Sequence, residues 1–454
     1  MLRRTFIASA IAALWAVAAP AFAGVSAEEA AALKGALTPL GAEKAGNAAG
    51  TVPAWEGGMA KAPAGWNSGD PRPDPFAGEK PVFQITGKNI DQYKDKLSDG
   101  TQAMLRKYPG YRLDVYPTHR TAAAPQYVYD NTFTNATRAK TANGGNTIEN
   151  AYGGTPFPIP KSGAEVMWNH LQRWRGGEAI DTDHDVWVVG TDGKPVLAVQ
   201  TVNNHQFPYY AKDGHGLEEY QGDYFLLRQG QTAPPFKAGE ALLIRDPLDQ
   251  IGKGRRAWQY LAGQRRVRRA PTVAFDTPDF VASGQNYFDE VFNFFGSLER
   301  YDWKLLGKKE VYIPYNNNRM LLGKAQDAMS ANHMDPDKLR WELHRVWVVE
   351  AQLLPGKRHV MPKKMFYLDE DTWAVVMMDG YDAQGQLWRT QHGIPYLCPD
   401  MPVVNTELSA VFNLLAGTWV LSAYPTPGMP TYRTAKARPD VYFSPDALAG
   451  GGVR

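Results

Sequence analysis

A series of strand-like segments joined by short turns runs through the middle and C-terminal parts of the chain. Residues 194–202 and 240–246, among others, are rich in apolar and β-branched side chains, and turns such as Pro355-Gly356 have the spacing of β-hairpins. Successive hairpins without intervening helices pair neighbouring strands in opposite directions. The pattern therefore predicts an α+β fold dominated by an antiparallel sheet, and not a parallel nucleotide-binding sheet.

Two of these segments, residues 344–353 and 372–379, are largely apolar on both faces: in the first, one face is apolar beyond Arg345 and the other is half polar. A sheet that is apolar on both faces must be covered on both, or must line an apolar cavity on one of them. A solid core and a cavity are therefore both open on this pattern. The side chains of interest on one face of each segment are Trp347, Val349, Leu353, Trp373, Val375 and Met377.

The rest of the chain contains few expected helices. Residues 24–80 begin with a short alanine-rich helical piece and continue as a Gly/Pro-rich run, which predicts an extended arm. Ser162 and Glu165 form a capping box that predicts a helix start. A further helix is expected in residues 287–298, where one face would carry Phe288, Val291, Phe292 and Phe295.

The first 23 residues have the form of a secretory signal. Arg3 and Arg4 precede an apolar run that is too short to span a bilayer, and small residues precede the expected cut after Ala23. We therefore expect a soluble protein in the periplasm. Its expected parts are a signal peptide (1–23), an arm (24–80) and a ligand-binding domain with insertions (81–454).

Composition narrows the function classes. Removal of Arg3 and Arg4 with the signal leaves as many basic as acidic side chains, which argues against a nucleic-acid binder. The single cysteine, Cys398, excludes an internal disulfide and a cysteine-rich metal site. No dinucleotide fingerprint in a suitable context, no H-E-x-x-H and no G-x-S-x-G occur. No catalytic residue, cofactor or metal is therefore predicted.

The aspartates of residues 181–185 resemble the start of a calcium loop. Val186 replaces the glycine that such a loop needs at its sixth position. We interpret the stretch as a solvated turn before a strand.

A run of arginines in residues 265–269 is the most basic stretch of the mature chain. On a strand that follows the Ala262-Gly263 turn, Arg265 and Arg269 would share one face, and Arg266 and Arg268 the other. One interpretation is cross-strand pairing with carboxylates of neighbouring strands. The other is that one pair lies at a cavity mouth and holds a lipid phosphate or carboxylate. The carboxylates considered for pairing are Glu342, Glu350 and Asp369.

Four long blocks of the sequence carry a resemblance to a known family. The blocks are residues 155–177, 258–280, 300–319 and 339–373. They resemble a large family of exported proteobacterial proteins that is labelled outer-membrane lipoprotein-sorting-like and placed in the LolA/LolB-like fold group. The resemblance implies a curved, unclosed antiparallel β-barrel, with helices plugging the concave face around a cavity for acyl chains. It implies as partners a resistance-nodulation-division type transporter and an outer-membrane protein, and it offers no catalytic residues.

These observations favour a periplasmic carrier or chaperone for a hydrophobic ligand, without chemistry of its own. The alternatives are a non-transporting scaffold for an inner-membrane transporter and an enzyme that acts on an envelope lipid. The expected ligand-binding residues are Trp347, Val349, Leu353, Trp373, Val375, Met377, Phe288, Phe292, Phe295, Arg265, Arg266, Arg268 and Arg269.

Overall fold

The structure is a computed structural model that describes residues 24–451, except 63, 68–69, 213–219, 221, 272 and 429–431. The expected signal peptide, residues 1–23, lies outside the described residues. Within the described part of the chain, no helix is both long and apolar enough to cross a membrane.

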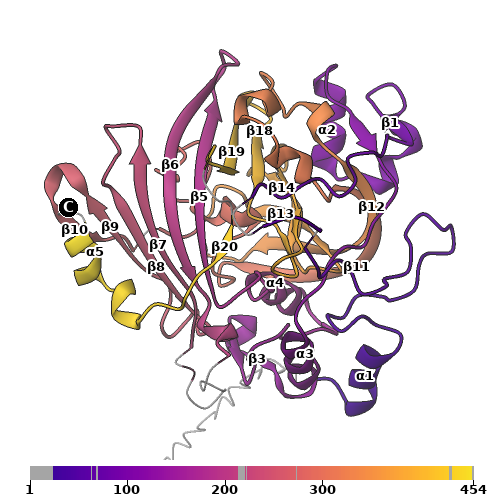
Figure 1. The fold of residues 1–454 in the computed structure, drawn as a ribbon, viewed down its shortest axis with the longest axis horizontal. Coiled ribbons are helices and arrows are strands. Elements are labelled where there is room, and N and C mark those ends of the chain that lie inside the picture. The colour runs from indigo at the N-terminus through magenta and orange to yellow at the C-terminus, as the bar shows by residue number, and fades with distance from the viewer. Residues whose placement is uncertain are drawn as a thin grey trace, which may run out of the picture.

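One large antiparallel sheet dominates the molecule (Figure 1), as the hairpin pattern predicts. Its strands follow the order β1-β2-β12-β13-β14-β15-β18-β19-β5-β6-β7-β8-β9-β10, with β11 beside β12 and β20 beside β5. Each pairing is antiparallel apart from a single parallel bridge between β2 and β12. The strands β1 and β10 end the order and do not pair with each other, so the sheet is open.

The strands of the large sheet are β1 Phe83–Ile85, β2 Leu113–Val115, β5 Ala179–Val189, β6 Pro195–Gln206, β7 Asp223–Ala233, β8 Ala241–Pro247, β9 Arg256–Leu261, β10 Arg266–Arg269, β11 Tyr301–Pro314, β12 Trp341–Leu353, β13 Lys363–Asp369, β14 Val375–Tyr381, β15 Leu387–Gly393, β18 Ser409–Asn413, β19 Thr418–Pro425 and β20 Arg433–Thr434. Two small hairpins are β3 Lys140–Ala142 with β4 Thr147–Glu149, and β16 Tyr396–Cys398 with β17 Val403–Asn405.

Five α-helices occur among the described residues: α1 Ala27–Ala31, α2 Asp99–Lys107, α3 Gln126–Arg138, α4 Gly163–Leu171 and α5 Pro445–Gly451. The short 3-10 helices are η1 Ala32–Lys34, η2 Ile90–Gln92, η3 Lys94–Lys96, η4 Asn143–Gly145, η5 Pro208–Tyr210, η6 Ala262–Gln264, η7 Phe288–Asn293, η8 Asn318–Leu321, η9 Ala325–Ala328, η10 Pro336–Lys338 and η11 Asp440–Phe443.

Helix α4 begins where the sequence predicts. The Ser162 hydroxyl accepts a hydrogen bond from the backbone N–H of Glu165 at 3.2 Å, which satisfies a free donor of the first turn. The Glu165 carboxylate accepts from the N–H of Lys161 at 2.6 Å, one residue before the expected position. The helix packs against β11 and β12.

The predicted helix at residues 287–298 is wrong. The chain forms only η7 there, because Val291 is extended and Phe292 has the left-handed φ of 54°. The aromatic residues of this segment therefore do not form one helical face. Helix α3 was not predicted, because its buried side includes the polar residues Thr132 and Asn135.

The arm lies against the first half of β12 and the β13–β14 turn. Between Lys34 and Phe83 the described residues form no helix and no strand. The Arg345 guanidinium donates to the carbonyl oxygen of Ala45 at 2.6 Å, and the Trp373 indole donates to that of Leu40 at 2.7 Å. Leu40 and Val52 of this segment also belong to the main hydrophobic core.

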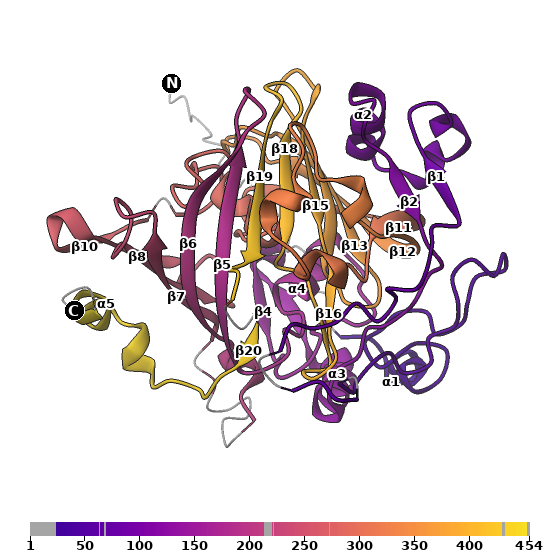
Figure 2. The ribbon, with the colours of Figure 1, turned by 45° about the horizontal axis from the view of Figure 1, so that its top comes forward.

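The half of the sheet from β5 to β10 has an outer and an inner face. The C-terminal segment, from β20 to α5, covers the outer face and packs Phe443 and Leu448 against Leu226 and Leu243. Figure 2 shows α5 beside β8 and β10 in a second view. The inner face is opposed by residues 279–295, here called the inner segment.

Candidate ligand-binding cavity

A cavity of about 70 Å³ lies between the inner segment and the inner face of β5–β8. This volume has room for roughly five water molecules. The lining residues are His184, Val186, Thr201, Asn203, His205, Leu227, Gln229, Leu242, Ile244, Asp279, Val281, Phe288, Val291, Phe292, Phe295, Glu407, Ser422 and Ala423. Polar side chains gather on β5 and β6, whereas aliphatic and aromatic ones come from β8 and the inner segment.

The register of the strands explains why these side chains meet. His205 is paired with Leu227, and Leu227 with Ile244, across three neighbouring strands. Asn203, Gln229 and Leu242 form the next row in the same way. Directly paired residues of an antiparallel sheet point to the same face, so both rows face the inner segment.

Two buried acidic residues anchor the inner segment to the other half of the sheet. The Glu290 carboxylate accepts two hydrogen bonds from Arg389 of β15, at 2.6 and 2.9 Å. The neighbouring Asp289 accepts from Lys364 of β13 and from the His359 imidazole. Burial raises the pKa of Asp289, but the charges of Lys364 and His359 lower it more, so it stays ionised.

Beyond these anchors the backbone is strained. Phe292 and Asn293 have φ values of 54° and 65°, a conformation that costs about 1–3 kcal/mol for each residue other than glycine. The buried Asn293 amide group also has no hydrogen-bond partner among the described residues. The strained turn directs Phe292 into the cavity. The inner segment is therefore fixed at Asp289 and Glu290, whereas the adjacent turn at residues 292–293 is strained and leaves the Asn293 amide without a hydrogen bond to any described residue.

Glu407 forms the polar end of the cavity, in the connection between β17 and β18. The residue is 3% exposed, and neither carboxylate oxygen has a hydrogen-bond partner in the described part of the chain. The neighbouring charged or polar atoms are His205 Nδ1 at 3.4 Å, Arg175 Nη1 at 3.7 Å and His184 Nε2 at 3.8 Å. These distances are longer than charge-assisted hydrogen bonds. The carboxylate therefore has ion-pair partners but no close hydrogen bond among the described residues.

Burial and the neighbouring Arg175 determine the protonation states of Glu407 and His184. Burial raises the pKa of Glu407, but His205, His184 and Arg175 outweigh burial and lower it to about 2. Burial lowers the pKa of His184 to about 4, so this imidazole is uncharged at neutral pH. Arginine remains protonated in proteins. At neutral pH the Glu407 carboxylate is thus balanced by the Arg175 guanidinium.

Arg175 also connects the polar end to the aromatic wall. Its guanidinium lies over the rings of Phe207, Phe225 and Phe292, with distances to the ring centroids of 5.5, 5.7 and 5.5 Å. Such cation–π contacts stabilise a buried cation that lacks hydrogen bonds. Movement of Phe292 would therefore also change the surroundings of Arg175.

The expected ligand-binding residues are distributed over three places. Phe288, Phe292 and Phe295 line the cavity. Trp347, Val349, Leu353, Trp373, Val375 and Met377 do not line it. They belong to, or in the case of the partly buried Trp347 and Leu353 pack against, the main hydrophobic core, which also includes the three phenylalanines. Contact of any of these residues with a ligand stays a prediction.

A β-bulge changes the expected alternation in β14. The register shifts so that Val375 pairs with Leu368 and Met377 pairs with Tyr367. Leu368 and Tyr367 are adjacent and point to opposite faces, so Val375 and Met377 do as well. The expectation that these two residues share a face is therefore wrong.

The arginine run lies at the free edge of the sheet, and all four of its arginines are exposed. Arg265 adopts the left-handed conformation in the turn, and β10 begins at Arg266. Arg268 pairs with Gln259, and Gln259 pairs with Leu242 of the cavity wall, so Arg266 and Arg268 project from the inner face.

The expected pairing of these arginines with carboxylates is wrong. Glu350 pairs with Lys363, and Glu342 with Arg340, all of them in or beside β12 and β13. These strands are separated from β10 by most of the sheet.

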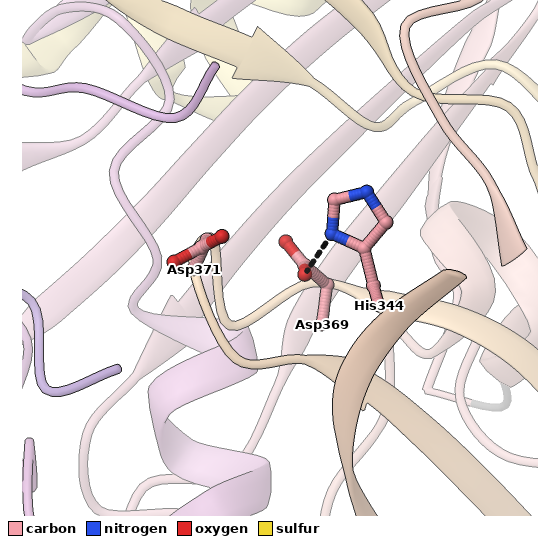
Figure 3. Close-up of side chains that lie close together, drawn as sticks. All are labelled: His344, Asp369 and Asp371. Carbon is pink, nitrogen blue, oxygen red and sulfur yellow. Dashed lines mark ion pairs between the residues drawn. The ribbon is translucent and has the colours of Figure 1, made fainter. Parts of the chain in front are cut away.

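A second buried cluster lies between β12 and the β13–β14 turn, where His344, Asp369 and Asp371 each offer a ligand atom within 4.8 Å of the others (Figure 3). Both oxygens of Asp371 accept hydrogen bonds from Arg120, at 2.6 and 2.8 Å. A metal ion would compete with this guanidinium for Asp371. We therefore interpret the cluster as a charge network that holds the turn and the arm.

The same cluster contains a coupled acid and imidazole. His344 Nε2 lies 3.1 Å from Glu342, and its Nδ1 lies 3.6 Å from Asp369. Burial and the charge of Asp371 raise the pKa of Asp369 to about 6. Burial lowers the pKa of His344, but Glu342 and Asp369 raise it above its usual value. The network therefore favours one proton held at Asp369 or His344.

The polar residues of the cavity were not predicted. His184 lies in the aspartate-rich stretch that was interpreted as a solvated turn, but residues 179–189 form the buried strand β5, so that interpretation is wrong. His205 continues the alternation of Thr201 and Asn203 along β6, which is a signal that the sequence contains. Glu407 shows no local pattern, because the sheet order alone brings it to β5 and β6.

The fold and the cavity define an α+β protein with an internal, partly apolar cavity on an open antiparallel sheet. The chain belongs to the family described as protein of unknown function DUF1329, whose model matches residues 84–449. This result confirms the family membership that the four sequence blocks indicate.

The chain is similar to one protein by sequence over most of its length and to two solved structures over part of it. An uncharacterized protein of Pseudomonas aeruginosa is 41% identical over 452 residues, which cover 96% of each chain. A DUF1329 family protein from Desulfovibrio piger is 15% identical, covers 60% of this chain and 91% of its own, and has a TM-score of 0.41. A LolA superfamily protein from Nitrosomonas europaea is 11% identical, covers 63% and 100%, and has a TM-score of 0.36.

Proposed function

We propose that this protein is a periplasmic carrier or chaperone that holds a hydrophobic ligand, such as lipid or lipoprotein acyl chains, between the inner segment and β5–β8. The observation that supports the proposal is the cavity itself, with its aromatic and aliphatic wall and its unpaired carboxylate. Each buried methylene of a ligand would contribute about 0.8 kcal/mol. Retention would need no chemistry, and release would need a handover partner.

Ligand entry would require movement of Phe292. The cavity of about 70 Å³ does not hold a long acyl chain. The Phe292 ring occupies the adjoining space, and its strained backbone lowers the cost of leaving that position. The anchors at Asp289 and Glu290 would stay in place while the turn at residues 291–293 opens.

The location and the partners are parts of the same proposal. Export follows from the signal-like form of residues 1–23. An inner-membrane transporter of the resistance-nodulation-division type and an outer-membrane protein are the proposed partners. Arg266 and Arg268 are the proposed contacts for a ligand phosphate or carboxylate outside the cavity.

The direct test is binding of N-phenyl-1-naphthylamine, an uncharged apolar fluorophore. The wild type should bind it with increased fluorescence. Gln229→Trp places an indole in the cavity wall and should abolish binding, whereas Thr232→Trp, at an exposed position of the same strand, should not. Thermal melts of both variants verify folding. Equal binding by both variants, or no binding by the wild type, would reject the proposed cavity.

A second candidate function is an enzyme that acts on a bound lipid. Its specific support is the convergence of His184, His205 and Glu407 on one cavity that also contains Ser422. Among the described residues, however, no serine, threonine or cysteine hydrogen-bonds to either imidazole. Burial also raises the pKa of Cys398 to about 12, which keeps that thiol unreactive.

Incubation with mono- and diacylglycerol esters separates the two functions. A carrier should release the lipid unchanged after extraction. Ester cleavage that His184→Gln abolishes would establish the enzyme instead.

A further inference from the structure

We infer that the deep end of the cavity binds an uncharged hydroxyl group of the ligand, which donates a hydrogen bond to Glu407. The inference rests on the proposed function and specifies the group that the ligand places at this end, an uncharged hydroxyl such as that of a fatty alcohol or an acylglycerol. It concerns only this end of the ligand and not a group outside the cavity. The inference follows from the unpaired oxygens of Glu407 and Gln229 and from the charges of Arg173 and Arg175 beside them.

The unpaired oxygens at the polar end are acceptors. Both carboxylate oxygens of Glu407 and the amide oxygen of Gln229 are buried and have no donor among the described residues. Both side chains line the cavity, and Glu407 is 3% exposed. Nitrogens that are unpaired among the described residues lie at the same end, namely Nη1 of Arg175, Nη2 of Arg173 and Nδ1 of His205. A hydroxyl group both donates and accepts, so a ligand hydroxyl would donate to Glu407 and accept from one of these nitrogens.

The surrounding charges exclude both kinds of ion. An anionic group beside Glu407 would face a buried carboxylate, which is strongly unfavourable at low dielectric. An ammonium group would face the Arg175 guanidinium, whose Nη1 lies 3.7 Å from the same carboxylate. Arg173 is also buried there and donates to Thr406, the neighbour of Glu407, at 3.0 Å. An uncharged donor is the group that meets no repulsion.

The geometry leaves space for such a donor. His205, Arg175 and His184 surround the carboxylate at 3.4–3.8 Å without a hydrogen bond. A hydroxyl oxygen bonds a carboxylate at about 2.6 Å, so it fits among these neighbours if the cavity holds it. The apolar part of the ligand then extends along Leu242 and Ile244.

The test compares three ligands that share a dodecyl or dodecanoyl chain, namely 1-dodecanol, methyl dodecanoate and dodecylammonium. Affinity is measured by displacement of N-phenyl-1-naphthylamine at neutral pH. The wild type should bind dodecanol about tenfold or more tightly than the ester, which lacks a donor. Dodecylammonium should bind less tightly than dodecanol.

Glu407→Gln is the decisive variant, because it removes the charge with little change of shape. Dodecanol should lose about tenfold in affinity, whereas the ester should change by less than about twofold. Unchanged ester binding also shows that the variant is folded. If the variant does not fold, the ligand order of the wild type alone decides the inference.

The outcomes separate the inference from the proposed function. Equal affinity for dodecanol and the ester, with no effect of Glu407→Gln, would indicate that water alone satisfies the carboxylate and would overturn the inference while the carrier stands. Preference for dodecylammonium would overturn it as well. Failure of every probe to bind the wild type would reject the carrier itself.

Discussion

Two buried carboxylates in different halves of the sheet have opposite surroundings. In the β13–β14 turn, both oxygens of Asp371 accept hydrogen bonds from Arg120. In the cavity, both oxygens of Glu407 lack a hydrogen-bond partner among the described residues, although three cationic or imidazole groups lie nearby. The difference teaches that burial alone does not identify a functional charge. A carboxylate whose two oxygens are both hydrogen-bonded holds the fold, whereas one without a close hydrogen bond beside a cavity is suited to bind a ligand.

The largest expected effect is on the paired carboxylate. Arg120→Gln leaves Asp371 buried without its partner, so we expect a loss of about 3–5 kcal/mol in the free energy of unfolding. Chemical denaturation measures this loss. Arg266→Gln, at an exposed edge position, is the control and should change stability by less than about 0.5 kcal/mol. A loss below about 1 kcal/mol for Arg120→Gln would contradict the structural role of the cluster.

The two regions should also titrate with opposite signs. The pKa of His184 is lowered to about 4, so the unfolded chain binds more protons and stability rises with pH between about 4 and 6.5. The pKa of Asp369 is raised to about 6, so the folded chain binds more protons and stability falls with pH between about 4 and 6. Each effect is on the order of 3 kcal/mol.

Two variants separate these titrations. His184→Gln should flatten the rise of stability with pH, and Asp369→Asn should steepen it. Denaturation curves at pH 4, 5, 6 and 7 give the slopes. Identical pH profiles for both variants and the wild type would show that neither group titrates as the structure indicates.

A smaller effect is expected for the unpaired carboxylate. Glu407→Gln removes no hydrogen bond that the described residues make, and Arg175 keeps its three aromatic contacts. Arg175 loses the charge that balances it, so we expect a loss of about 2–3 kcal/mol in the free energy of unfolding, below the loss for Arg120→Gln. A loss as large as that of Arg120→Gln would show that Glu407, like Asp371, mainly stabilises the fold. The two regions would then not differ in the way that we describe.

The smallest stability effect is expected at the arginine edge. Arg266→Gln combined with Arg268→Gln removes two exposed charges for which the described residues provide no ion pair. The melting temperature should stay within about 1–2 °C of the wild type, because exposed substitutions cost little. Retention of an anionic lipid should weaken if these arginines contact its headgroup. A lower melting temperature with unchanged retention would favour a structural role.

The parts of the fold that could be predicted depend on neighbouring residues. Strand periodicity and hairpin turns define the antiparallel sheet, and Ser162 with Glu165 marks the start of α4. The phenylalanines of the inner segment were predicted as ligand-binding residues, and they line the cavity. The helix predicted for their backbone does not form. The left-handed conformation of Phe292 depends on tertiary anchors at Asp289 and Glu290, which a helical periodicity cannot represent.

The polar end of the cavity could not be predicted, because its residues are distant in sequence. Glu407 follows β17, His184 and His205 belong to β5 and β6, and Arg175 lies after α4. They meet only because β19 pairs with β5, which joins the two halves into one continuous sheet. The bulge in β14 likewise follows from pairing with β13, and it places Val375 and Met377 on opposite faces.

Extraction of the purified protein with organic solvent, followed by mass spectrometry, tests the central claim most directly. Wild type and Gln229→Trp are produced in the same host and purified side by side. The wild type should carry a hydrophobic compound in near-stoichiometric amount, and Gln229→Trp should carry much less of it. Equal amounts in both proteins, or no copurifying compound together with no binding of N-phenyl-1-naphthylamine by the wild type, would contradict the account.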